Sequence, residues 1–447
     1  MSRSRYFTEL SKTLVLAFPI AAGHVSQMLL GLADTLMIGR VGVVPLAASA
    51  FAHSLFHIVF IVGVGLLTAV AVLVAHAHGA GDKQVVGEML RRGLAISVVG
   101  GIGMLLLLLS LFPLLDRIGQ PPEVIAVTKP YLFLLSLGLP FLMAIICFRN
   151  YSEAQNIPWI AFWAGLIAVI LNIFLNWILI YGNLGAPALG LNGAGIATLI
   201  ARVFNLVLLV VWLRMDKRFS GCWPVVWWKK IPWRNIMEML RLGFPVGMQL
   251  LMEVGAFSFA ILLMGWLGVV ELAAHQIAIT CAATTFMFPL GLSIAVSIRV
   301  GHVIGAGEPV LARTVGFGGI GFAVFLSGIF TYVFIVFNRQ LAGLFTTDPE
   351  TVTMAASLLV VAGIFQFFDG TQALGAGALR GCKDVTIPTG IIFAAYWLLA
   401  MPLGAYLAFL TPMAAVGIWI GLAVGLGFAA IGLVGRFMLI SRRVISH

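Results

Sequence analysis

Three carboxylates stand inside long apolar stretches of this sequence: Asp34, Glu253 and Asp369. An ionised group at membrane depth costs roughly 2.5–3.5 kcal/mol on insertion scales, so such residues are rare without a function. Gln27 and Gln249 precede Asp34 and Glu253 at helical spacing, which places amide and carboxylate on one helix face. The chemistry open to such groups is the binding and release of protons or cations. In apolar surroundings, and with like charge, we expect Glu253 and Asp369 to hold protons readily.

Further polar residues recur at helical spacing in other apolar stretches. They are Gln276, Thr280 and Thr284, then Gln366 and Gln372 on either side of Asp369, then Asn172, Asn176 and Thr198. Taken singly, each is best interpreted as a hydrogen-bonding residue between helices. The histidines show no metal-ligand spacing, so packing is the favoured interpretation for them. The sequence offers no physical explanation for Arg202 inside an apolar stretch.

The composition indicates that a membrane surrounds these residues. Apolar residues make up 61% of the 447 residues and charged residues only 9%, whereas soluble domains carry about 25% charged residues. The net charge of +10 could indicate nucleic acid as a partner. We reject nucleic acid because Lys and Arg are confined to short gaps between apolar runs, as membrane orientation signals are.

Twelve apolar runs are long enough to span a bilayer, which predicts an all-α integral membrane protein. The predicted spans are 13–38, 45–76, 88–112, 123–149, 157–181, 188–213, 235–266, 271–303, 310–337, 349–380, 385–409 and 413–440. We expect an N-terminal six-helix lobe at 1–213, a cytoplasmic interfacial linker at 214–234 and a C-terminal six-helix lobe at 235–447. The tryptophans and basic residues of the linker favour the headgroup level, although an ordinary connector is an equal alternative.

Positive charges predict the orientation. Of the 26 Lys and Arg residues, 21 lie in the gaps on one side or at the termini, four lie in the gaps on the other side, and Arg202 lies within a span. Basic residues favour the cytoplasmic side. Both termini are therefore expected in the cytoplasm.

The two halves repeat each other under a shift of 226 residues. Phe18-Pro19 falls on Phe244-Pro245, and Gly79-Ala80-Gly81-Asp82 falls on Gly305-Ala306-Gly307-Glu308. Because six spans separate corresponding points, the halves run in the same sense across the membrane, as in transporters with parallel repeats. We expect the substrate in a cleft between the two six-helix bundles.

Several chemistries lack their motifs here. The sequence has no GxxxxGK[ST] loop for ATP and no GxSxG or HExxH pattern for hydrolysis, and its four cysteines form no CxxC pair. We therefore expect no enzymatic activity and no cofactor other than a coupling ion.

With these features the chain resembles the MATE (multidrug and toxic compound extrusion) family, in its bacterial NorM branch. The half-repeat, Asp34-Thr35, Glu253, Ala273-Ala274-His275-Gln276, Asp369 and the Leu379-Arg380-Gly381 run carry the resemblance over nearly the whole chain. It implies a MATE fold of two parallel, pseudo-symmetric bundles. It also implies a secondary active multidrug exporter of cationic or amphipathic drugs in the bacterial inner membrane, driven by H+ and/or Na+.

The resemblance also implies roles for individual residues. The cation-coupling residues would be Asp34, Glu253, Asp369, Asn172, Asn176 and Thr198. The substrate-binding residues would be Gln27, Ser54, Gln276, Glu253 and Asp369. A Na+ ion would bind at Asp34, Asn172, Asn176 and Thr198. Phe365 stands where some relatives have Tyr four residues before the Asp369 position, which argues against Na+ beside Asp369.

We predict a multidrug antiporter that acts as a monomer in the lipid bilayer on small cationic or amphipathic drugs. The main alternative is a flippase for lipid-linked oligosaccharide of related fold, which would need a strongly basic cavity. A polytopic membrane enzyme is the second alternative, and it would need a nucleophile–base pair or a metal set. The natural substrate, the choice between H+ and Na+, the stoichiometry and the oligomeric state stay open at the level of sequence.

Overall fold

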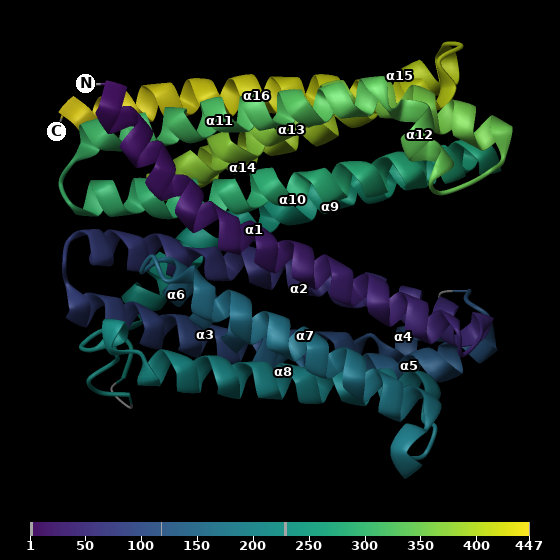
Figure 1. Cartoon of the computed structure of the whole chain (residues 1–447), viewed down its shortest axis with the longest axis horizontal. Coiled ribbons are helices and arrows are strands. Elements are labelled where there is room, and N and C mark those ends of the chain that lie inside the picture. Colours follow the sequence, from purple (N-terminus) through teal and green to yellow (C-terminus); the bar gives the residue numbers. More distant parts are fainter. Residues whose placement is uncertain (1–2, 118, 228–229, 447) are drawn as a thin grey trace. The chain divides into compact units, whose positions relative to one another are not determined.

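The computed structural model describes residues 3–117, 119–227 and 230–446, so residues 228–229 of the predicted linker lie outside it. The described residues form helices and no strand (Figure 1). The helices are α1 (Arg3–Gly39), α2 (Val43–Gly79), α3 (Lys83–Ser110), α4 (Phe112–Leu115), α5 (Pro122–Leu137), α6 (Leu139–Glu153), α7 (Pro158–Tyr181), α8 (Gly190–Met215), α9 (Trp233–Leu267), α10 (Val269–Gly305), α11 (Pro309–Val336), α12 (Asn338–Gly343), α13 (Pro349–Gly381), α14 (Thr386–Phe393), α15 (Met401–Leu410) and α16 (Ala414–Ser446), with short segments η1 (Asn183–Gly185), η2 (Lys217–Phe219) and η3 (Ala394–Ala400).

Within the described residues, twelve helical segments are long and apolar enough to cross a membrane, and they confirm the twelve predicted spans. Nine of the spans are single helices, and three combine consecutive ones: α3 with α4, α5 with α6, and α14 with η3 and α15. The boundaries differ most at the first span, where α1 begins at Arg3 and not at 13. The third span begins at Lys83 and not at 88. The cause is a polar cap, since Asp82 Oδ1 accepts hydrogen bonds from the main-chain nitrogens of Gln84 and Val85 over 3.1 and 3.0 Å.

Two spans carry irregularities at membrane depth. Between α5 and α6 the helix breaks at Gly138, and Pro140 two residues later cannot donate a main-chain hydrogen bond. In the eleventh span, η3 (Ala394–Ala400) is π-helical, which inserts an extra residue into the turn. π-Helical segments inside α-helices occur frequently at functional sites.

The chain divides into two compact units, and each is described by itself. Unit 1 comprises Met1–Ala21 and Met248–His447, and unit 2 comprises Ala22–Gly247. The boundaries therefore lie within α1 and α9, two and three residues away from Pro19 and Pro245. The predicted division into lobes at 214–234 stays a prediction, and the compact units add that α1 and α9 each contribute to both.

In unit 1, α13 packs against α10, α11 and α16. Close approach to α10 depends on glycine, because a Cβ on Gly377 would lie 2.5 Å from the main-chain oxygen of Ser293. The Ser293 hydroxyl donates to the main-chain oxygen of Ala373 over 2.6 Å. The first segment of α1 joins this unit through a buried ion pair between Glu9 and Arg299.

In unit 2, α2 packs against α3, α5 and α6, while α7 pairs with α8. Fully buried residues of α5, among them Tyr131, Leu132 and Leu135, fill the interior together with small residues of α2. The connection after α8 is docked on the end of α6, since the Tyr151 hydroxyl donates to the main-chain oxygen of Cys222 over 2.8 Å. Its predicted position at a membrane surface stays a prediction.

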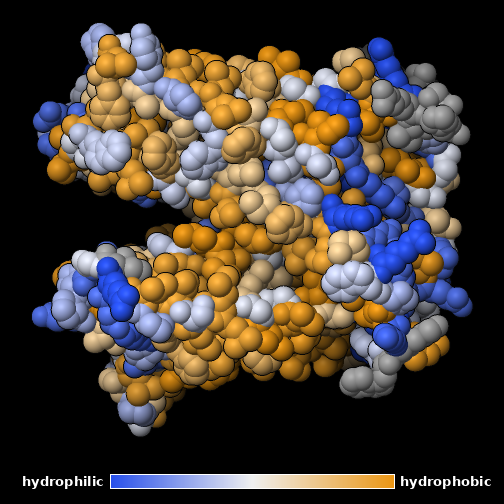
Figure 2. Space-filling view, turned by 180° about the vertical axis from the view of Figure 1, so that it is seen from behind, coloured by the Kyte–Doolittle hydropathy of each residue, from blue (hydrophilic) through white to orange (hydrophobic). Residues whose placement is uncertain are grey.

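The surface pattern agrees with a membrane-embedded chain. Figure 2 shows hydrophobic side chains covering the middle of the helices on the visible face, while hydrophilic side chains gather near their ends. Large apolar side chains are strongly exposed along the spans, among them Val99, Ile170 and Ile431. In water such a surface would be costly, whereas lipid chains solvate it.

Candidate functional site

A carboxylate held by two amides forms the core of the polar site in unit 1. Glu253 Oε1, on α9, accepts hydrogen bonds from Gln249 Nε2 over 3.1 Å and from Gln372 Nε2, on α13, over 3.0 Å. The Tyr396 hydroxyl, from the π-helical η3, donates to Gln372 Oε1 over 3.3 Å. Three separate helical elements therefore fix the orientation of one carboxylate.

Asp369 completes this site. It lies one turn before Gln372 on α13, is 8% exposed, and is within electrostatic range of Glu253. Arg380, at the end of α13, is within electrostatic range of Glu253 and donates from Nη2 to the Ser293 hydroxyl over 3.0 Å. Arg380 thus lies near Glu253, whereas Glu253 is the charged neighbour of Asp369, so a negative charge remains on the pair when both carboxylates are ionised.

Aromatic rings form the apolar wall beside these carboxylates. The rings of Phe257 and Phe365 meet edge to face with centroids 6.0 Å apart, and Phe365 packs against Trp419 with centroids 5.4 Å apart. Phe257 also contacts Tyr396. Phe365 therefore places a ring and no oxygen ligand one turn before Asp369 on α13.

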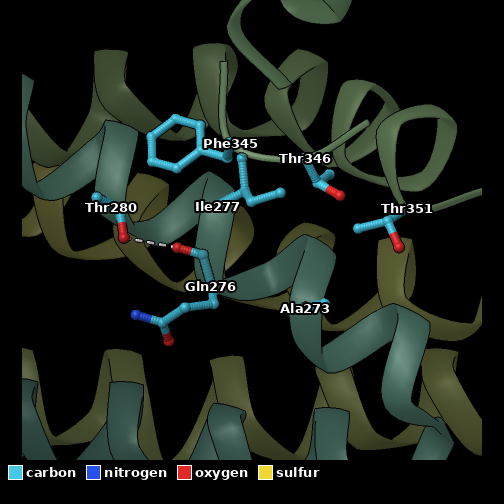
Figure 3. Close-up of a pocket in the computed structure, with 7 residues that line it drawn as sticks. All are labelled: Ala273, Gln276, Ile277, Thr280, Phe345, Thr346 and Thr351. Carbon is cyan, nitrogen blue, oxygen red and sulfur yellow. Dashed lines mark hydrogen bonds between the residues drawn. The ribbon is translucent and has the colours of Figure 1, made fainter. Parts of the chain in front are cut away.

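A pocket of about 350 Å³ lies elsewhere in unit 1, along the first half of α10 (Figure 3). Gln276, Thr280 and Ile277 line it from α10, and Phe345 and Thr346 line it from the segment before α13. The predicted substrate contact Gln276 therefore faces a separate pocket of the same unit, which the Glu253 carboxylate does not line.

In unit 2 the four residues predicted for Na+ are joined by hydrogen bonds. Asn176 Nδ2 donates to Asp34 Oδ1 over 2.6 Å and to Asn172 Oδ1 over 3.0 Å, and Asn172 Nδ2 donates to Thr198 Oγ1 over 3.4 Å. Asn176 Oδ1 is buried and has no hydrogen-bond partner among the described residues, so this amide oxygen is open to a cation. Binding of Na+ at these four residues stays a prediction.

Next to these residues lies Arg202, for which the sequence offered no explanation. Its Nη1 donates to the main-chain oxygen of Leu135 over 2.9 Å, and its guanidinium lies 5.0 Å from the centre of the Phe56 ring. Asp34 is within electrostatic range of it. No spacing could have revealed this residue, because its partners are a main-chain oxygen and an aromatic face.

The structure brings some predicted residues together and leaves others apart. Glu253 and Asp369 lie within electrostatic range of each other in unit 1. In unit 2 a chain of hydrogen bonds links Asp34 to its three predicted partners. The predicted substrate contacts Gln27 and Ser54 are exposed on α1 and α2, and the Ser54 hydroxyl donates to the main-chain oxygen of Ala50 over 2.9 Å within its own helix. Their role in substrate binding stays a prediction.

In the described part of the chain, no group of three or more His, Cys, Asp or Glu side chains is placed to hold a metal ion.

Tyr396 was missed in the sequence because a single tyrosine in an apolar run carries no signal. Only the π-helical turn aims its hydroxyl at Gln372.

Comparison with known proteins identifies the family. The MatE family model matches residues 19–178 and 245–406. Two relatives are each named "Probable multidrug resistance protein NorM": one from Bradyrhizobium diazoefficiens is 35% identical over 98% of this chain and 95% of its own length. The other, from Pseudomonas putida, is 36% identical over 98% and 96%.

Solved structures agree with the fold. One described as the outward-facing conformation of a multidrug resistance MATE family transporter of the MOP superfamily superposes with a TM-score of 0.90 at 20% identity, over 98% of this chain and 97% of that chain. The Vibrio cholerae MATE transporter VcmN in the bent form gives 0.87 at 21% identity, over 99% of each chain. By its match over both halves and its full-length relatives, this chain belongs to the MatE family of membrane transporters.

Proposed function

We propose that this protein is a secondary active multidrug exporter, which moves cationic or amphipathic drugs out of the cell in exchange for H+, Na+ or both. The names of its relatives support drug resistance as the physiological context. The proposal places the chain in the bacterial inner membrane, as a monomer with both termini in the cytoplasm. It needs no cofactor besides the coupling ion.

The surplus negative charge of the Glu253–Asp369 site carries this proposal. Two carboxylates lie within electrostatic range of each other inside a membrane-spanning unit, and Arg380 is within range of Glu253. A buried surplus charge is unfavourable, so the site favours a bound proton or a cation. Both neutralise the same charge, and so the arrival of one promotes release of the other. Competition of this kind is the minimum requirement for exchange.

The walls of the site support a flat, amphipathic cation as substrate. The rings of Phe257, Phe365 and Trp419 pack together, and Phe257, which is partly exposed one turn after Glu253, can offer its face to an organic cation. Two amides hold one oxygen of Glu253, which fixes the direction of its charge. Drug cations with planar ring systems fit this combination of aromatic contact and fixed charge.

We propose the proton as the main coupling ion, exchanged at Glu253 and Asp369. Phe365 supplies no oxygen there for Na+, which prefers several oxygen ligands. Na+ at Asp34, Asn172, Asn176 and Thr198 is the second proposal, and it is supported by the oxygen-bearing side chains that the fold gathers there. A flippase is less well supported, because the unit 1 site is acidic on balance.

Purified protein in liposomes tests this function. A pH gradient without Na+ should drive uptake of a cationic dye into inside-out vesicles, and a Na+ gradient at equal pH should drive much less. Glu253→Gln and Asp369→Asn should abolish transport. Glu350→Gln is the matched control, since Glu350 is an exposed carboxylate in the first turn of the same helix as Asp369.

Unchanged dye transport in both site variants would remove these carboxylates from the mechanism. A Na+-driven flux that survives Asn176→Ala but is lost in Asp369→Asn would place the ions in the opposite units. Expression in a bacterium that lacks its own pumps adds the test of substrate class, because resistance should rise for cationic drugs first.

A further inference from the structure

The connection that follows α8 is packed onto the rest of unit 2. We call its residues 216–227 the docked connection. Its Phe219 ring is fully buried and stacks on the Tyr151 ring of α6 with centroids 5.6 Å apart, and the Tyr151 hydroxyl donates to the main-chain oxygen of Cys222. A Cβ on Gly87, in α3, would lie 2.7 Å from a main-chain oxygen of this segment. The docked connection therefore lies against both α6 and α3, and its exposed side chains extend from a well-packed backbone.

Three basic side chains gather at the docked connection. The Arg214 guanidinium, from the last turn of α8, lies 4.4 Å from the centre of the Trp223 ring. Lys83, the first residue of α3, runs beside Gly221, because a Cβ on that glycine would lie 3.5 Å from Lys83 Cδ. Lys217 is exposed in η2. Among the described residues, none of these three cations forms an ion pair.

Two acidic side chains of this region already have basic partners. Asp216 pairs with Arg218 over 2.6 Å, and Glu88 pairs with Arg91 over 2.8 Å. Asp82 accepts main-chain hydrogen bonds at the start of α3. Positive charge is therefore in excess around the docked connection, and such a surface attracts an anionic partner.

An exposed apolar stripe of α8 ends at the same place. Val207, Val211 and Met215 follow one another at helical spacing and are 56%, 47% and 74% exposed. The docked connection begins directly after Met215, and its own Val225 and Val226 are exposed as well. Lipid chains solvate such a stripe, and basic side chains at the end of a span favour the level of the lipid headgroups.

We propose that this surface binds an anionic phospholipid: Lys83, Arg214 and Lys217 attract its phosphate, and its acyl chains lie along the stripe of α8. Lys and Arg donate charge-assisted hydrogen bonds to phosphate oxygens, and each basic residue near a membrane surface strengthens the binding of anionic lipid about fivefold. A soluble anion would gain the same attraction of charge but no contact with the stripe. The combination therefore favours a lipid, and it does not depend on the exporter function.

Native mass spectrometry of the purified protein in a neutral detergent counts bound lipid molecules and so measures this binding. Phosphatidylglycerol should bind in one saturable step, and phosphatidylcholine should bind at least about tenfold more weakly. Lys83→Gln combined with Lys217→Gln should lower the affinity for phosphatidylglycerol at least about tenfold. The matched control is Arg241→Gln combined with Arg339→Gln, which removes the same charge at exposed residues of α9 and α12 and should leave the affinity unchanged.

A second pair of variants keeps every charge of the protein. Gly87→Ala would place a methyl group against the main chain of the docked connection, so this segment should shift and the affinity for phosphatidylglycerol should fall. Gly100→Ala, on the same helix, is the control, because a Cβ there meets no atom within 4 Å. This control should bind phosphatidylglycerol like the wild type. Thermal unfolding of both variants reports whether they are folded.

Four results overturn the proposal. Equal binding of phosphatidylcholine and phosphatidylglycerol would show that the surface does not select anionic lipid. Competition by ammonium phosphate at equal ionic strength would identify a soluble anion as the ligand. Equal losses in the Lys83–Lys217 variant and in its control would show that only the net charge of the protein matters. A folded Gly87→Ala protein with wild-type affinity would remove the docked connection from the site.

The charge variants decide the proposal even if Gly87→Ala does not fold. No transport is measured in these experiments, so failure of the exporter function would not alter their results. The liposome experiment tests that function separately.

Discussion

The amides around Glu253 allow a prediction in which substrate affinity and protein stability separate. Gln249 and Gln372 each donate one hydrogen bond to the same carboxylate oxygen. A hydrogen bond to a charged group contributes about 1.5–3 kcal/mol, and about 1.4 kcal/mol corresponds to a tenfold change in affinity. Gln249→Met and Gln372→Met should therefore each weaken binding of a cationic dye about tenfold, because each removes a hydrogen bond that stabilises the ionised Glu253 carboxylate, which attracts the dye.

Stability should respond differently to the two substitutions. Gln372 also accepts the hydrogen bond of the fully buried Tyr396, and a buried hydroxyl without a partner costs about 1–3 kcal/mol. Gln372→Met should thus lower the unfolding temperature more than Gln249→Met does. Adding Tyr396→Phe to Gln372→Met should restore stability but not affinity, since the carboxylate still lacks its donor.

Fluorescence anisotropy of the dye at fixed pH reports affinity, and intrinsic tryptophan fluorescence during heating reports stability. Glu253→Gln provides the reference for complete loss of the carboxylate charge. If Gln372→Met binds the dye like the wild type while Glu253→Gln does not, the amides do not stabilise the binding form of Glu253. An affinity loss in Tyr396→Phe as large as that in Gln372→Met would contradict the assignment of Tyr396 to an indirect role.

Three further results are expected. Glu9→Gln should destabilise the protein by about 3 kcal/mol in thermal unfolding, because Arg299 then keeps a buried charge without its carboxylate, and adding Arg299→Gln should recover part of the loss. A cysteine placed at Gly185 should react with an impermeant thiol reagent from outside the cell, and one at Lys217 should not, while the reverse pattern would invert the topology. Burial and, to a smaller extent, the nearby carboxylate of Asp384 raise the pKa of Cys382 to about 12. Alkylation of this thiol, measured by peptide mass spectrometry, should therefore be slow at pH 8, and its rate should rise about tenfold per pH unit. Fast alkylation at pH 8 would contradict the burial of this thiol.

The sequence was sufficient to predict the membrane-spanning helices and the carboxylates inside them, and the reason is physical. Hydropathy and charge cost are local properties, so the twelve spans and the three carboxylates inside them are visible without knowledge of the packing. Helical spacing also placed Gln249 beside Glu253 correctly, because both residues lie on one face of α9.

What could not be predicted depends on departures from regular helix. The hydroxyl of Tyr396 reaches Gln372 from a π-helical turn, and a regular helical register gives no indication of that direction. Arg202 donates to the main-chain oxygen of Leu135, beside the break between α5 and α6. A pattern of side chains in the sequence cannot indicate a main-chain partner. The unit boundaries inside α1 and α9 depend on long-range contacts, which hydropathy does not record.

The internal repeat shows how the two units can differ in chemistry while sharing a scaffold. Under the shift of 226 residues, the Phe18-Pro19 pair and the glycines keep their counterparts, but Glu253 falls on Gln27 and Asp34 falls on Ala260. Each half has therefore placed its helical carboxylate at a position where the other half has none. Unit 1 holds two carboxylates within electrostatic range of each other, whereas Asp34 in unit 2 is joined through hydrogen bonds to two amides and a hydroxyl. Two carboxylates close to each other favour a bound proton, and one carboxylate among neutral oxygens favours a hard cation. Symmetry of the fold therefore gives no reason to expect symmetry of coupling.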